Sequence, residues 1–401
     1  MSCLLFYRAS IGEAMEFRDL KKQYQVLREE MDRAVLDAMA SGAYIMGPQV
    51  RALEQQLAEY VGVKHCLTCA NGTDALTLAL KAWGIGPGDA VFVPDFTFFS
   101  SAEVVPLEGA EPVFVDVCED TFNIDASDLE RAVKEVLSEG RLRPRVVVAV
   151  DLFGLPADYQ AIRAVADRYG LLVLEDGAQG FGGTFGGKRA YSFGDIATTS
   201  FFPAKPLGCY GDGGAVLTDN DEWAALIASY RVHGKGTFKY DNVRIGLNSR
   251  LDTVQGAVLQ VKLKAFAEYE LDAVNEVAAR YSEFLQGLAT PVIPAGYRSS
   301  WAQYTVRFAS SEERDAVQAA LKADGIPAMV YYPKPLHRQA AFDKTPDQVG
   351  GDGREVIPGS TGNLCPVATS LCERVLSLPL HPYMGLEDIE TVCNAIRKAL
   401  R

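Results

Sequence analysis

The stretch Leu171–Gln179, LLVLEDGAQ, decides the fold. A run of apolar residues ends in two carboxylates, a glycine, an alanine and a glutamine. A short apolar run of this kind is typical of a strand that is buried on both faces, and ligands in parallel sheets bind at the carboxyl ends of the strands. The sequence therefore predicts a strand that brings Glu175, Asp176 and Gln179 to the binding edge of a sheet.

Similar runs precede this stretch, separated from it and from one another by helical spacing of apolar residues. They lie at residues 90–96, 111–117 and 145–154. A helical pattern at 48–61 and a short apolar run around HCLTC come earlier, and Ser127 and Glu130 show the spacing of a capping box at the start of a later helix. This alternation of strands and helices predicts an α/β fold with a mostly parallel sheet and helices on both faces.

The length and the later pattern predict two domains. A chain of 401 residues is long for one core, and residues 252–288 form a helical pattern without strands. We expect a large domain at 16–264 and a smaller C-terminal α+β domain at 265–401. Residues 1–15 are interpreted as an N-terminal extension, and the glycine-rich segment 345–363 as a mobile loop.

The charge and the cysteine content exclude several classes of protein. The net charge is −13, so the chain shows no basic surface of the kind that binds nucleic acid. The sequence contains no run of about 18 apolar residues, so no membrane span is predicted. We expect no secretory signal in the first residues, because no basic segment precedes their short apolar patch. Eight cysteines, scattered without a disulfide-like framework, indicate a reduced, cytoplasmic protein. From the charge and the hydropathy we expect neither a nucleic-acid nor a membrane partner.

The motif HCLTC allows two interpretations. His65, Cys66 and Cys69 could be metal ligands, or they could lie in a buried strand. Because no second cysteine pair with zinc spacing follows, the buried strand is favoured and no metal is expected.

The stretch Ser200–Pro206, SFFPAKP, places one lysine in an apolar segment between two prolines. Burial lowers the pKa of an amine, which makes it a nucleophile. Lys205 is the lysine whose surroundings best meet this need. The alternative is a loop lysine whose amine extends into water, and this stretch by itself does not decide between them.

Two further motifs point to one cofactor. In ANGTDAL, Gly72 and Thr73 begin a helix, whose free N–H groups suit a phosphate, although an ordinary helix cap would look the same. Asp176 at its strand end could pair with a protonated ring nitrogen. A phosphate site, a ring-nitrogen partner and a buried lysine together describe the binding of pyridoxal 5′-phosphate (PLP) through a Schiff base.

Several motifs, in this order, resemble the DegT/DnrJ/EryC1/StrS family of PLP-dependent sugar aminotransferases. They are GAYIMGPQV, ANGTDAL, VFVPDFTFFSSAE, VLEDGAQ, TSFFPAKPLGCYGDGGA, GLNSRLDTVQ and YYPKPLH. The resemblance runs from about residue 16 to residue 384. It implies the PLP-dependent transferase fold type I, which is similar to aspartate aminotransferase, with a large sheet domain and a smaller C-terminal α+β domain.

The resemblance also implies roles for the catalytic and cofactor-binding residues. Lys205 would carry the cofactor and move the proton, and Asp176 would keep the pyridine nitrogen protonated. Gln179 would lie near the 3-oxygen of the cofactor. Phe98 would stack on the ring, although a core position is the open alternative.

The phosphate would be bound by residues from two subunits. Gly72, Thr73 and Ser200 would contribute from one subunit and Asn248 from the other, so the resemblance implies a homodimer with shared active sites. Arg250 is a candidate for substrate binding at the same place, or else a structural ion-pair partner.

The substrate would contact Tyr331, Tyr332 and His337. In the family pattern a histidine is common where this chain has Tyr331, which changes a donor at the sugar site. Arg250, Lys334 and Arg338 are further cations for a nucleotide diphosphate and a carboxylate.

The branch that this chain resembles most aminates UDP-2-acetamido-2-deoxy-3-oxo-glucuronate with glutamate as donor, for bacterial surface polysaccharides such as lipopolysaccharide O-antigen. One alternative is a PLP-dependent sugar dehydratase, which typically has histidine at the lysine position and is disfavoured by Lys205. The other is a non-catalytic regulator that has kept the fold.

Overall fold

The computed structural model describes residues 15–238, 240–342 and 365–401. The predicted extension, apart from its last residue, and the predicted loop at 345–363 lie outside these ranges. Within them, no helix is both long enough and apolar enough to cross a membrane.

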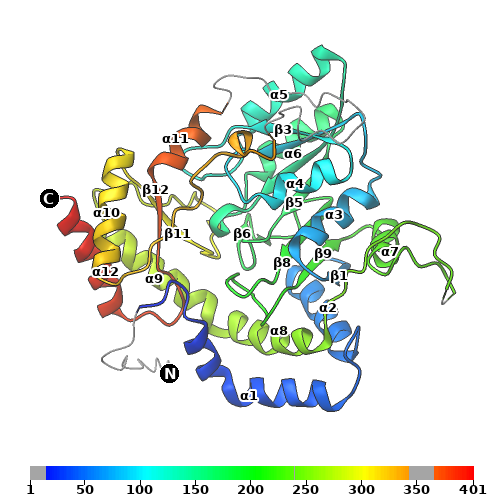
Figure 1. The fold of residues 1–401 in the computed structure, drawn as a ribbon, viewed down its shortest axis with the longest axis horizontal. Coiled ribbons are helices and arrows are strands. Elements are labelled where there is room, and N and C mark those ends of the chain that lie inside the picture. The colour runs from blue at the N-terminus through cyan, green and yellow to red at the C-terminus, as the bar shows by residue number, and fades with distance from the viewer. Residues whose placement is uncertain (1–14, 239, 343–364) are drawn as a thin grey trace.

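A seven-stranded sheet forms the centre of the molecule (Figure 1). Its strands, in spatial order, are β1 (His65–Cys69), β9 (Gly214–Thr218), β8 (Ile196–Ser200), β5 (Leu172–Asp176), β4 (Arg143–Val150), β2 (Asp89–Pro94) and β3 (Glu111–Val115). The pairs from β8 to β3 are parallel, whereas β9 is antiparallel to both β8 and β1. The predicted mostly parallel sheet is confirmed, and β8 and β9, which the sequence patterns did not identify, join β1 to it.

Helices cover both faces of this sheet. One face is packed by α3 (Gly72–Ala82), α4 (Ser100–Leu107) and α7 (Asp221–Tyr230). The other is packed by α5 (Ala126–Glu139) and α6 (Tyr159–Tyr169), and by α2 (Pro48–Val61) with α8 (Thr253–Ala265). The sheet is therefore apolar on both faces, as the continuous apolar runs predict.

One predicted helix start is wrong. Helix α5 is capped by Asp125, whose carboxylate accepts the N–H groups of Ser127 and Asp128, so Ser127 lies inside the helix and not at its cap. Asp and Ser are both strong caps, and the spacing of Ser127 and Glu130 does not exclude Asp125, two residues earlier, as the cap.

A smaller layer contains the C-terminal part of the chain. It consists of the pair β11 (Tyr304–Arg307) and β12 (Val375–Leu378) with α9 (Leu271–Phe284), α10 (Ser311–Ala323), α11 (Pro366–Arg374) and α12 (Leu386–Ala399). Helix α8 continues through a π-helical turn (Phe266–Glu270) into α9. The proposed domain boundary at 264/265 falls inside this continuous helical run.

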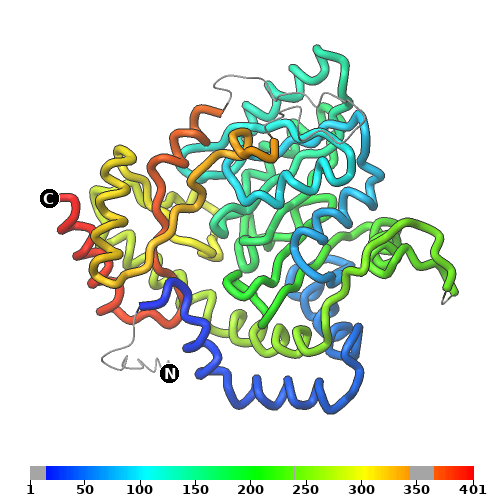
Figure 2. The backbone as a smooth tube through the Cα atoms, in the orientation of Figure 1, coloured from blue at the N-terminus to red at the C-terminus, as the bar shows by residue number. Residues whose placement is uncertain are grey.

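The remaining elements are one long helix and several short pieces. Helix α1 (Leu20–Ala40) lies beside α8 (Figures 1 and 2), and a three-stranded ribbon pairs β10 (Tyr297–Arg298), β6 (Thr184–Phe185) and β7 (Lys188–Arg189). One 3-10 turn, Leu152–Gly154, follows β4, and another, Leu336–Arg338, lies between α10 and α11.

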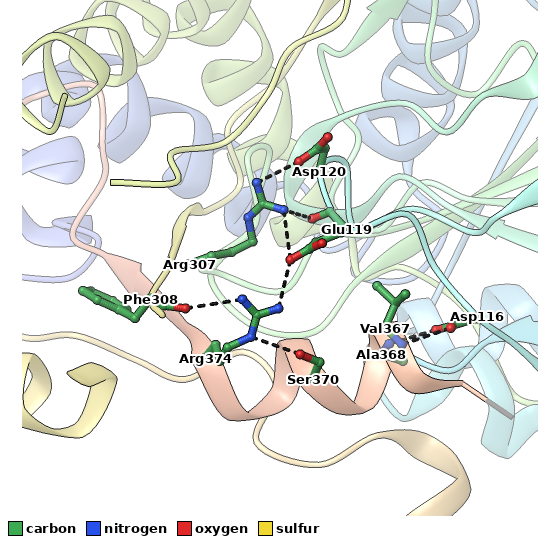
Figure 3. Close-up of polar contacts among 9 residues, drawn as sticks. All are labelled: Asp116, Glu119, Asp120, Arg307, Phe308, Val367, Ala368, Ser370 and Arg374. Atoms are coloured by element: carbon green, nitrogen blue, oxygen red, sulfur yellow. Dashed lines mark hydrogen bonds and ion pairs between the residues drawn. The ribbon is translucent and has the colours of Figure 1, made fainter. Parts of the chain in front are cut away.

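Polar contacts join the smaller layer to the loop after β3 (Figure 3). The Asp116 carboxylate accepts the N–H groups of Val367 at 3.0 Å and Ala368 at 2.8 Å, at the start of α11. Arg374 pairs with Glu119 at 2.9 Å. Asp116 thus serves as a cap from outside the helix, because it satisfies N–H groups that have no partner within the helix.

We predict that Asp116→Ala lowers the free energy of unfolding by about 1–2 kcal/mol, the range for losing a capping carboxylate. Urea denaturation measures the change, and Asp116→Asn, which keeps an accepting oxygen, should lose less. The control is Asp315→Ala, whose carboxylate is 64% exposed and pairs with the neighbouring Arg314. A loss in Asp116→Ala no larger than in this control would refute the capping role.

Candidate active site

The Asp176 carboxylate is buried at the carboxyl end of β5. The Ser101 hydroxyl donates to its Oδ2 at 2.7 Å, and the Ala178 N–H donates to its Oδ1 at 3.2 Å. Burial raises the pKa of Asp176, while these hydrogen bonds and the nearby charge of Lys205 oppose the rise. No ion pair engages this carboxylate among the described residues, so it can accept a cationic partner such as a protonated ring nitrogen.

The neighbouring Glu175 has a different role. Its carboxylate accepts the backbone N–H groups of Tyr191, Phe193 and Gly194. Successive side chains of a strand point to opposite faces, so Glu175 anchors the loop before β8 while Asp176 points to the face covered by α4. Burial raises the pKa of Glu175 to about 7.

Lys205 lies in a loop whose backbone is held at both ends. The Phe201 N–H donates to Gly213 O and the Cys209 N–H to Phe201 O, each at 2.7 Å, and the Lys205 N–H donates to Phe202 O at 2.9 Å. Burial lowers the pKa of the Lys205 amine, against the opposing charge of Asp176. A loop lysine whose amine extends into water would not be desolvated in this way, so the nucleophile interpretation fits better.

The start of α3 lies against the end of β8. A Cβ atom on Gly72 would be 2.7 Å from Ser200 Cβ, so only glycine allows this approach. Asn71 caps the helix by accepting the Asp74 N–H at 2.7 Å. Because that cap serves only Asp74, the N–H groups of Gly72 and Thr73 have no acceptor in the described part of the chain and could bind a phosphate.

Gln179 connects the site to two other segments. Its Oε1 accepts the Phe153 N–H at 2.7 Å, and its Nε2 donates to the Tyr332 hydroxyl at 3.1 Å. The Tyr332 ring lies 6.3 Å from the ring of Phe98, which is 54% exposed. The core alternative for Phe98 is therefore wrong, and its ring is accessible to a ligand.

The segment 331–337 comes to this edge from the C-terminal part of the chain. His337 Nδ1 lies 2.5 Å from Asp95 Oδ2, and the His337 N–H donates to Asp95 Oδ1 at 2.8 Å, just beyond β2. Tyr331 is half-buried and packs edge-on against Phe17 with 6.1 Å between ring centroids. The fold thus brings together three of the predicted substrate residues: Tyr331, Tyr332 and His337.

Asn248 and Arg250 are not joined to that group. Asn248 is exposed, and the Arg250 guanidinium donates to its Oδ1 at 2.5 Å. Arg250 forms no ion pair with any described carboxylate, so the structural ion-pair alternative is not supported. Neither side chain contacts Lys205 or Asp176 within this chain as far as the structure describes it.

Two polar residues of the site were not predicted from the sequence. Ser101 lies in the motif FTFFSSAE, and Asp95 ends the strand motif VFVPD. The one sequence feature that could have identified them as site residues is their position after the end of a strand. The described residues contain no group of three or more His, Cys, Asp or Glu side chains that could hold a metal ion. Cys66 and Cys69 are buried in β1, as the strand interpretation expects.

The residues present fit PLP. A helix start can take the phosphate, the buried Asp176 carboxylate can take the ring nitrogen, and the Lys205 amine has a lowered pKa. These three groups come from α3, β5 and the loop after β8, which meet at one edge of the sheet.

We predict that Gly72→Ala weakens PLP binding by the apoprotein roughly tenfold to hundredfold, the range for about 1–3 kcal/mol of overpacking. The new methyl group would push the start of α3 away from Ser200. Fluorescence titration with PLP measures the affinity. Gly86→Ala is the control, since its Cβ would meet nothing closer than 3.7 Å. Equal affinities in the two variants would show that the close approach does not shape the phosphate site.

Comparison with known proteins supports this assignment. Residues 25–397 match the model of the DegT/DnrJ/EryC1/StrS aminotransferase family. The UDP-2-acetamido-2-deoxy-3-oxo-D-glucuronate aminotransferase of Pseudomonas aeruginosa is 42% identical over 384 residues, which cover 95% of this chain and 99% of the relative. The UDP-N-acetyl-3-dehydro-alpha-D-glucosamine 3-aminotransferase of Acidithiobacillus ferrooxidans is 39% identical, over 96% of this chain and 98% of the relative.

A solved structure shows the same fold. The crystal structure of a DegT DnrJ EryC1 StrS aminotransferase from Brucella abortus superimposes with a TM-score of 0.89 at 48% identity, and the match covers 96% of this chain and 99% of that one. The predicted fold type I is confirmed. The chain belongs to the DegT/DnrJ/EryC1/StrS aminotransferase family, whose members depend on PLP.

Proposed function

We propose that this aminotransferase moves an amino group from glutamate to a keto sugar nucleotide, with UDP-2-acetamido-2-deoxy-3-oxo-glucuronate as the acceptor. The observation that carries the proposal is the Lys205–Asp176 pair, which lies in a chain 42% identical to an aminotransferase named for that sugar. Arg250, Tyr331, Tyr332 and His337 are the proposed sugar-nucleotide residues.

Lys205 is the proposed catalytic base. Bound PLP supplies a carrier for the amino group and an electron sink. The Lys205 amine holds the cofactor in the resting enzyme and then moves a proton to or from the substrate carbon, for which it must be neutral. Burial of this amine lowers its pKa and so favours the neutral form.

The other proposed cofactor-binding residues would orient the cofactor and polarise its ring. Asp176 would lie opposite the ring nitrogen, where the hydrogen bonds from Ser101 and Ala178 favour its charged form against the effect of burial. Gln179, fixed by the Phe153 N–H, would lie near the 3-oxygen, and Phe98 would stack on the ring. Gly72, Thr73 and Ser200 would hold the phosphate.

A second copy of the chain is proposed to complete the site. Residues 232–238 and 240–249 form an arm that extends away from the sheet after α7 (Figures 1 and 2), and it exposes Phe238 by 75% and Ile245 by 91%. Exposed apolar side chains of this size mark a contact surface. In a homodimer this arm would carry Asn248 to the partner's phosphate site and Arg250 to its sugar site.

The cellular role follows from the substrate. The product would be a 3-amino sugar acid for a bacterial surface polysaccharide such as lipopolysaccharide O-antigen, made in the cytoplasm. The seven described cysteines are all free thiols, which fits a reducing compartment. Lys205 argues against the sugar dehydratase, and the presence of both Lys205 and Asp176, within electrostatic range of each other, argues against the non-catalytic regulator.

We predict that Asp176→Asn slows kcat by roughly 10² to 10⁴, the range for removing a positioned charge or proton-transfer partner. The assay supplies glutamate and the UDP-3-oxo sugar acid and follows 2-oxoglutarate and the amino sugar. Asp212→Asn, which changes an exposed carboxylate farther along the Lys205 loop, should keep wild-type turnover. If the wild-type enzyme does not aminate this sugar, the proposed acceptor is wrong; if Asp176→Asn is fast, the ring-partner role is wrong.

We predict that Lys205→Ala and Asn248→Ala subunits, each poorly active alone, regain part of the activity when mixed. A mixed dimer has one site with both residues intact, because Asn248 would come from the opposite subunit. Subunit exchange is verified by native mass spectrometry. Verified exchange without any gain in turnover would contradict the shared site.

A further inference from the structure

Two cations that the proposed mechanism does not use lie against the loop that carries Lys205. Arg18, just before α1, donates from Nη2 to Pro206 O at 3.4 Å. The Lys262 Nζ, on α8, lies 4.3 Å from the centroid of the Tyr210 ring. Pro206 and Tyr210 flank the same short loop, so both cations approach it from the side of α1 and α8.

Neither cation forms an ion pair with a described carboxylate. The Lys262 residue is 1% exposed, and its Nζ, which faces the Tyr210 ring, has no hydrogen-bond partner. The hydrogen bond from Arg18 goes to a backbone carbonyl, that of Pro206. An unpaired charge taken out of water is costly, so the two groups are arranged for a partner that the chain itself does not supply.

The local charge balance is positive. Burial lowers the pKa of both Lys205 and Lys262, the latter to about 8, and the charge of Arg18 lowers both further, so the guanidinium lies within electrostatic range of both amines. The buried Glu270 opposes the lowering of the pKa of Arg18 and Lys262, but its carboxylate already accepts from Gln23 Nε2 at 2.9 Å and from the Tyr383 hydroxyl. The cluster can therefore take one further anion.

Arg18 also lies next to the proposed substrate segment. The ring of the preceding residue, Phe17, packs on Tyr331, and the Phe17 carbonyl accepts the Leu380 N–H at 3.1 Å. The residue is thus held between the Lys205 loop on one side and Tyr331 on the other. An anion bound there would belong to a molecule in the active site.

We propose that Arg18, with Lys262 behind it, forms a carboxylate-binding subsite beside Lys205. The planar guanidinium can hold both oxygens of a carboxylate, and the buried ammonium adds charge without a competing partner. This inference rests on the proposed function, which brings two carboxylic acids to the site: glutamate and the uronate sugar. The subsite explains how a chain with a net charge of −13 attracts acidic substrates to its reactive amine.

The test measures binding to the PLP-loaded enzyme without turnover. The probes are glutarate, which has the two carboxylates of glutamate but no amine, UDP-glucuronate, and UDP-N-acetylglucosamine, which has no carboxylate. Calorimetry gives each Kd for the wild type and for Arg18→Gln, Arg18→Lys and Lys262→Met. Arg28→Gln is the matched control, because Arg28 is an exposed residue on the neighbouring α1 that pairs with Asp32.

The expected result is a Kd raised about tenfold to hundredfold in Arg18→Gln for one carboxylate probe, the range for a hydrogen bond to a charged group. Binding of UDP-N-acetylglucosamine should not change, and Arg18→Lys should recover part of the loss. Selective loss of glutarate assigns the subsite to the amino donor, and selective loss of UDP-glucuronate assigns it to the sugar.

Unchanged binding of both carboxylates, or an equal loss for all three probes, would overturn the proposal. Should Lys262→Met not fold, the Arg18 series stands alone, since Arg18 is only half-buried. A wild-type enzyme that binds the carboxylates through Arg18 but does not aminate the UDP-3-oxo sugar acid would refute the proposed acceptor and leave the subsite standing.

Discussion

The buried carboxylate of Asp176 is the constraint on which the rest of the site depends. A carboxylate without an ion-pair partner is tolerated there only because Ser101 and Ala178 donate to it and the Lys205 charge lies nearby. Its position requires the strand order of the sheet, which places β5 between β4 and β8. It also requires Glu175 to hold the loop before β8 from the opposite face.

Polar contacts near the site also link the two layers of the molecule. The segment from Tyr331 to His337 belongs to the C-terminal part of the chain, yet it is tied to the sheet edge through Asp95 and Gln179. Asp116 and Arg374 connect the loop after β3 to α11 on the same side (Figure 3). Polar contacts therefore hold the proposed sugar-binding segment against the sheet that carries the proposed cofactor residues.

Local charge, and not the overall charge, governs what this site can bind. The chain is acidic as a whole, but the loop around Lys205 has Arg18 and Lys262 beside it with few acids to balance them. Short-range electrostatics in a desolvated site outweigh the screened surface charge. An acidic protein can thus present a basic subsite to an acidic substrate.

The sheet class and the family could be read from the sequence, which also singled out Lys205 as the candidate nucleophile. Strands β1 to β5 could be predicted, because apolar runs with polar ends depend on local chemistry. It did not reveal β8 and β9, since IATTS and GAVLT are short and are recognisable as strands only when paired with each other and with β1. Ser101, Asp95, Arg18 and Lys262 lie far from Asp176 and Lys205 in the chain, and their hydroxyl, carboxyl and cationic groups carry no local signal. Only the tertiary structure brought them to the site, because a hydrogen bond or a charge pair depends on distance in space and not on spacing in the sequence.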